Sequence, residues 1–173
     1  MNTNETNVSL NDLINTAVDK TLNKIDKTKS GNMVHSTTRS DDDYLSSWQS
    51  RFIARIEDMV SSFLDFPDTI PKDFQDKQFA RHLLWRIGDN KKAFKLIMMK
   101  GAYAASFDFL FKRLMPYITG ELPEEVSSID NRYMKLSINL FEIIQDYVIL
   151  HESNFEELMT RIVHAINVAR YVK

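Results

Sequence analysis

The chain has 173 residues, of which 43% are apolar and 27% are charged, with a formal net charge of -2, four glycines, four prolines and no cysteine. This size suits one domain, and the scarcity of Gly and Pro argues against a turn-rich β-sandwich and predicts long helices. The lack of cysteine excludes disulfides, thiolate metal sites and cysteine nucleophiles.

The N-terminal part predicts a helical arm on a flexible linker. The first ten residues, MNTNETNVSL, lack the basic start and apolar run of a secretory signal. Residues 9–26 carry apolar side chains at helical spacing, whereas residues 27–42 are polar and without periodicity. We therefore expect an arm and linker at 1–42 and a helical bundle domain at 43–173. The arm packs either on a partner chain or back on its own domain. Its apolar stripe is Leu10, Leu13, Ile14, Ala17, Val18, Leu22 and Ile25.

A narrow apolar seam of coiled-coil type follows, at steps of three and four residues. Asp41 to Asp43 favour the start of this helix, and Pro67 and Pro71 close it. The seam consists of Leu45, Trp48, Phe52, Ile56, Met59, Phe63 and Phe66.

Four further helices and one glycine turn are predicted before the last helix. A helix from about residue 73 to 87 buries Phe74, and Gly88 with Asp89 or Asn90 forms the turn to a helix ending near residue 100. The next helix runs over 102–115 and is stopped by Pro116. Pro123, with two glutamates after it, opens a long helix over 124–150.

The last helix, over 154–172, is opened by the S-x-x-E capping box of Ser153 to Glu156. No segment alternates like a strand. The fold class is therefore all-α, a helical bundle of about five to six helices with an N-terminal helical arm on a flexible linker.

The most apolar window is FKLIMMKGAYAASFDFLFK, residues 94–112. Lys95, Lys100 and Asp108 lie inside it, and each charge at a bilayer centre costs roughly 2.5–3.5 kcal/mol. The window is therefore not a membrane span, and we expect a soluble cytoplasmic protein. Small residues between Met and aromatic side chains indicate either a small-molecule pocket or a plain core. The pocket candidates are Phe94, Met98, Met99, Tyr103, Phe107 and Phe111.

Charge is unevenly distributed along the chain. Residues 72–118 hold ten Lys and Arg against four acids, and both neighbouring segments are acidic. Internal ion pairing explains this distribution, and a docking face for an anionic partner is the alternative. Nucleic acid is possible but not favoured, since the helix after Gly88 is too apolar in its middle to lie in a groove. The candidate basic face is Arg86, Lys91, Lys92, Lys95, Lys112 and Arg113.

No motif for catalysis is present. The four histidines have no second His three or four residues away, and no Gly-rich phosphate loop or G-x-S-x-G occurs. Paired glutamates such as Glu124 and Glu125 lie at expected helix starts, where capping explains them. We therefore expect a protein that is not an enzyme and has no cofactor and no metal.

Residues 73–170 resemble the C-terminal effector domain of TetR-type transcriptional regulators. The segment DNKKAFKLIMMKGAYAASFDFLFKRLM looks like the opening of that domain, and INLFEIIQDYVILHESNFEELMTRIV is similar to its closing helix pair. The resemblance implies a homodimer formed by the closing helices and an apolar cavity. The family's helix-turn-helix DNA reader is not found in residues 1–60. The implied dimer residues are Leu140, Ile144, Tyr147, Leu158, Ile162 and Ile166.

Two functional hypotheses follow. The first is a non-enzymatic regulatory protein that dimerises and binds another macromolecule, such as a protein partner, through the arm and the basic face. The second is a ligand-responsive transcription regulator that binds a small apolar molecule among residues 94–111.

Overall fold

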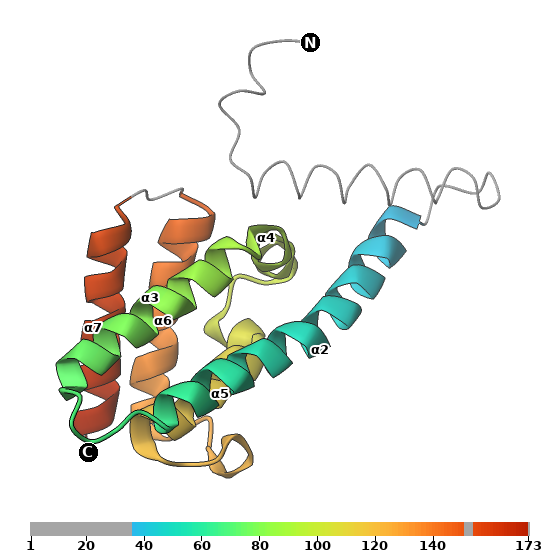
Figure 1. Cartoon of the computed structure of the whole chain (residues 1–173). Helices are drawn as coiled ribbons and strands as arrows, with labels where there is room; N and C mark the ends of the chain where they lie inside the picture. The colour runs from blue at the N-terminus through green and yellow to red at the C-terminus, as the bar shows by residue number, and fades with distance from the viewer. Residues whose placement is uncertain (1–35, 151–153, 173) are drawn as a thin grey trace.

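The computed structural model describes residues 36–150 and 154–172 (Figure 1). Over these residues the chain forms α-helices and short 3-10 helices and has no strand, which confirms the all-α bundle. The predicted arm at 9–26 lies outside the described residues. The elements are α2 (Ser36–Leu64), α3 (Lys72–Gly88), α4 (Lys91–Lys100), η2 (Ala104–Phe107), α5 (Asp108–Thr119), η3 (Pro123–Glu125), α6 (Asn131–Val148) and α7 (Phe155–Tyr171).

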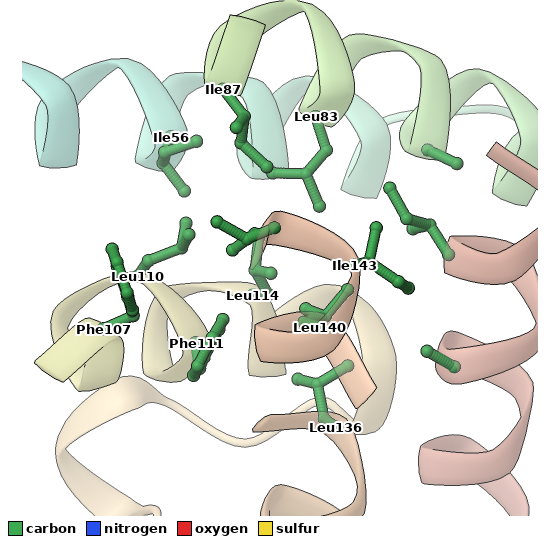
Figure 2. Packing of buried hydrophobic residues seen from close by; sticks show 14 of the residues in the cluster. Ile56, Leu83, Ile87, Phe107, Leu110, Phe111, Leu114, Leu136, Leu140 and Ile143 are labelled. Carbon is green, nitrogen blue, oxygen red and sulfur yellow. The ribbon is translucent and has the colours of Figure 1, made fainter. Parts of the chain in front are cut away.

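The helices pack in pairs around one core. Helix α2 packs on α5, α3 crosses α7 obliquely, and α6 pairs with α7 (Figure 1). Side chains from α2, α3, α5 and α6 point into a common centre, as Figure 2 shows for Ile56, Leu83, Leu114 and Leu140. Burial of this apolar surface is the main force that holds the bundle together.

The apolar seam of α2 faces this core. Trp48, Phe52, Ile56, Met59 and Phe63 are all buried. A seam at coiled-coil spacing here packs inside its own chain, because α4 and α5 supply the facing surface. The helix begins at Ser36, so residues 36–42 are helical, and the expected linker over 27–42 is wrong for that part.

The turn between α3 and α4 is fixed by Asn90. Its side-chain amide donates to the Arg86 carbonyl at 2.6 Å, and its Oδ1 accepts from Trp48 Nε1 at 2.8 Å. Asn90 therefore ties α2 to the turn between α3 and α4, and it makes no side-chain cap to α4. Phe74, expected in the core, is exposed on the outer side of α3.

The prediction that Pro116 stops its helix is wrong. Helix α5 continues through it to Thr119 and ends at Gly120, whose φ of 82° is in the left-handed region that favours glycine. Proline removes one backbone hydrogen bond, but both neighbours, Met115 and Tyr117, are buried. Their packing outweighs that loss. The residues before α5 form the 3-10 helix η2, where one α-helix from 102 was expected.

The start of the long helix was also placed too early. Pro123 opens only the short η3, in which Glu125 accepts from the Leu122 amide at 3.2 Å. Helix α6 begins seven to eight residues later in the chain, where Asp130 accepts from the backbone amides of Arg132 and Tyr133. Two satisfied amides make Asp130 the stronger start signal.

Helix α7 begins at Phe155, close to the expected position. Its cap is Asn154, which accepts from the Glu157 amide at 3.0 Å, and not the predicted capping box. Ser153, the first residue of that box, lies outside the described residues. Helices α6 and α7 thus have their own N-caps, and their apolar faces pack against each other.

Candidate interaction surface and cavity

The residues predicted to line an apolar pocket are separated by the fold. Met99 lies on α4 outside its buried face and is 80% exposed. Tyr103 follows the end of α4 and is 73% exposed. The other four are buried, and the three phenylalanine rings among them pack against neighbouring rings, as in the stacked pair of Phe94 and Phe107 with centroids 5.3 Å apart. These four side chains, Phe94, Met98, Phe107 and Phe111, belong to the core cluster.

The residues predicted for the dimer interface pack against other parts of the same chain. Tyr147 packs over Gly88, where a Cβ would meet the tyrosine hydroxyl at 2.5 Å, and the ammonium of Lys91 lies 4.5 Å from its ring centroid. The remaining five line the buried contact between α6 and α7 and are not available on the surface. They are Leu140, Ile144, Leu158, Ile162 and Ile166.

Most of the candidate basic face is engaged by the chain itself. Lys112 pairs with Asp108 at 3.3 Å, and Arg113 lies 3.8 Å from Glu57. Lys92 is buried, with its ammonium 5.4 Å from the ring centroid of Tyr44. Burial lowers the pKa of Lys92. The remaining three, Arg86, Lys91 and Lys95, are half-buried on α3 and α4, and the Lys91 ammonium lies over the ring of Tyr147. This arrangement favours the internal-pairing interpretation of the basic segment.

A second apolar stripe runs along the outside of α6. Met134 is 41% exposed and Ile138 is 52% exposed, Phe141 is half-buried, and Ile149 follows after the end of the helix. These positions recur at steps of four and three residues, and then of eight, so they lie on one side of the helix. We name Met134, Ile138, Phe141 and Ile149 the α6 outer stripe. The spacing was visible in the sequence, but it did not show which of two stripes is buried.

Charged residues of opposite sign flank the α6 outer stripe. Lys135 lies one turn before its centre and Glu142 one turn after it, both exposed and on the same side of the stripe. Neither takes part in an ion pair among the described residues. Ile138 lies between them. An antiparallel partner helix with the same sequence would therefore place Glu142 beside Lys135 twice.

A buried ion pair joins α3 to α7. Asp76 accepts from both terminal nitrogens of Arg170 at 2.8 and 3.0 Å, and it accepts from the Tyr117 hydroxyl at 2.7 Å. Asp76 is 2% exposed. Burial and the bond to Asp76 raise the pKa of Tyr117. Burial alone would lower the pKa of Arg170, but hydrogen bonding and attraction to Asp76 outweigh it and raise that pKa.

A cavity of about 290 Å³ lies beside this ion pair. It is bounded by the end of α2, the connection to α3, the first turn of α3 and the ring of Tyr117. Lys72 at the start of α3 lines it, and its ammonium is 4.5 Å from the Tyr117 ring centroid. Its apolar lining includes Phe63, Phe66 and Ile70.

Comparison of the chain with protein-family models, with curated proteins and with solved structures found no match. Within residues 36–150 and 154–172, no cluster of three His, Asp or Glu side chains is placed to hold a metal ion. In the same residues, no helix combines the length and the apolar character needed to cross a bilayer.

Proposed function

We propose that the protein is a non-enzymatic homodimer that acts by binding another macromolecule, and that its self-contact is the α6 outer stripe. The observation that carries this proposal is the exposed row of Met134, Ile138 and Ile149 beside a fully formed core. Apolar side chains in a continuous exposed row mark contact surfaces. The TetR-type resemblance supports a dimer, but the contact proposed here lies on the opposite side of α6.

The two α6 helices cross antiparallel in this dimer, with the two-fold axis between Ile138 and Asn139. An isologous contact brings each residue of the stripe to the equivalent surface of the other copy. Lys135 of one copy then meets Glu142 of the other, and the symmetry repeats the pair. Each exposed pair contributes about 0.2–1 kcal/mol, so the apolar stripe supplies affinity and the charges supply direction.

The first test is the mass of the particle in solution. Size-exclusion chromatography with light scattering should give a dimer for the wild type and a monomer for Ile138→Glu. The substitution would bury one new carboxylate from each copy at the contact, and the exposed Lys135 and Glu142 pairs cannot offset that cost. Phe74→Glu is the matched control, since Phe74 is also 52% exposed but lies on α3. A monomeric wild type at high concentration, or equal loss of dimer in both variants, would refute the proposed contact.

The second test exploits the charge symmetry. Lys135→Glu and Glu142→Lys should each weaken the dimer, because each places like charges opposite one another. The double variant should restore wild-type association by exchanging the two charges. The two single variants and the double variant all keep the apolar stripe. Recovery of association in the double variant would therefore show that the single variants lost pairing and not folding. Failure of the double variant to recover association would mean that α6 does not pair antiparallel.

The dimer would carry two copies of the predicted arm at 9–26, and two linked contacts raise avidity for a common partner. Deletion of residues 1–35 removes the arm without entering α2, which begins at Ser36. We expect the deleted protein to keep its helical circular-dichroism spectrum and its dimer mass. Loss of the dimer on this deletion would mean that the arm, and not α6, makes the self-contact.

A further inference from the structure

The cavity beside the Asp76–Arg170 ion pair has the composition of a small-molecule site. Its volume of about 290 Å³ is near the lower end of ligand pockets, which begin at about 300 Å³. The side chains of Phe66 and Ile70 give the lining an apolar part, polar groups make up most of the remaining open surface, and Lys72 adds a positive charge. Such a lining fits a compact molecule with one apolar end and one charged end.

The ring of Tyr117 is fixed on one side of this cavity. Phe79 stacks on it at 4.1 Å with an interplanar angle of 6°, and Asp76 holds its hydroxyl. Asp76 in turn is held by two bonds from Arg170. Since Phe79 covers one face of the ring, the Lys72 ammonium lies over the other face. The ring of Tyr117 therefore holds the Lys72 ammonium at the cavity.

The charges around the cavity favour an anion. Arg170 already neutralises Asp76, so the ammonium of Lys72 is the additional charge at the buried ion pair. Burial, and next repulsion from Arg170, lower the pKa of Lys72. Asp68 is a second charged group in the lining, but it is exposed and forms no ion pair with Lys72 among the described residues. A negative group placed beside Lys72 would relieve the repulsion between the two cations.

We propose that this cavity binds a small aromatic carboxylate, with its carboxylate on the Lys72 ammonium and its ring against Phe66 and Ile70. A single ammonium matches one carboxylate better than a doubly charged phosphate. The amide of Gln75 is already committed to the Ile70 carbonyl at 2.9 Å, so it does not compete for the anion. This site lies at the connection of α2 to α3, and it does not depend on self-association through α6.

The test is a titration of the full chain with 3-phenylpropionate, followed by calorimetry and by amide chemical shifts. We expect saturable binding, with shifts centred on residues 63–75 and on Tyr117. Lys72→Gln should weaken this binding at least tenfold, because it removes the cation. Lys77→Gln is the matched control, since it removes the same charge from an exposed position of α3 outside the cavity lining.

Two further probes separate the parts of the proposal. The alcohol 3-phenylpropanol has the same ring without the charge, and it should bind at least tenfold more weakly than the acid. Inorganic phosphate should not compete. No saturation at millimolar 3-phenylpropionate, equal binding of acid and alcohol, or competition by phosphate would each overturn the proposal. Circular-dichroism melting of Lys72→Gln verifies that the variant is folded.

Discussion

The two ends of the bundle are held together by different chemistry. At the α2–α4 end, Trp48, Phe52 and Phe94 pack ring against ring, with centroids 4.8 to 5.7 Å apart. At the α3–α7 end, Asp76 and Arg170 form a buried ion pair, although they are 94 residues apart in the sequence. Aromatic packing tolerates substitutions of similar volume, whereas a buried ion pair depends on both partners. The same fold therefore contains one adaptable end and one specific end.

The largest effect is expected from Asp76→Ala at the ion-pair end. The substitution leaves Arg170 buried without its carboxylate and removes the acceptor of the Tyr117 hydroxyl. We expect a loss of about 3–5 kcal/mol in the free energy of unfolding, measured by urea denaturation. The double variant Asp76→Leu with Arg170→Met should lose less than Asp76→Ala alone, because no charge stays buried. A double variant that is less stable than the single one would contradict this explanation.

A smaller effect is expected from Phe94→Leu at the aromatic end. Phe94 is fully buried and contacts the rings of Trp48, Phe52 and Phe107, but leucine keeps most of the apolar volume. We expect a loss of roughly 1–2 kcal/mol, also measured in urea. If this loss equals that of Asp76→Ala, then the proposed difference between the two ends is wrong.

Trp48→Phe tests the polar contact of the aromatic end. It keeps an aromatic ring in place but removes the donor to Asn90 Oδ1. A lost hydrogen bond of this kind costs about 1 kcal/mol. Trp85→Phe is the matched control, because that ring is half-exposed on α3 and should change stability by less than about 0.5 kcal/mol. Equal stability of the two variants would show that Asn90 does not tie α2 to the turn.

The smallest effect concerns His82, whose ring lies against Phe63 near the ion-pair end. Burial, with repulsion from Arg86 and Arg81, lowers the pKa of His82 below its ordinary 6.5. The unfolded chain therefore binds a proton first as the pH falls, and stability decreases from pH 6.5 downward until the folded pKa is reached. Melting temperatures at pH 7.5 and 5.5 should show a smaller decrease for His82→Gln than for the wild type. An identical decrease would assign the pH dependence to other groups.

Local patterns in the sequence predicted most helices, and tertiary packing decided where the predictions fail. The seam from Trp48 to Phe63 is predictable because its spacing of three and four residues repeats over about four turns. Proline lacks an amide and therefore predicts a stop at Pro116, yet the burial of its neighbours keeps α5 intact. Asp130 was missed as a cap, since Pro123 gave a stronger signal earlier in the chain.

The candidate sites were harder to predict than the fold. Helix α6 has two apolar stripes, and the sequence alone could not show that Leu140 and Ile144 face inward while Ile138 faces outward. The contact of Asp76 with Arg170 leaves no periodic trace in the sequence, because it joins helices that are distant along the chain. The cavity brings together the end of α2, the start of α3 and Tyr117 of α5, which are distant along the chain, so it too was not predictable from spacing.

The long separation of Asp76 and Arg170 has a consequence for the order of events during translation. When α3 leaves the ribosome, its carboxylate has no cation to meet, and water must keep it solvated. The Asp76–Arg170 ion pair therefore forms only after α7 has been synthesised, as expected for contacts of high sequence separation. The link between α3 and α7 is thus among the last contacts that the nascent chain can make.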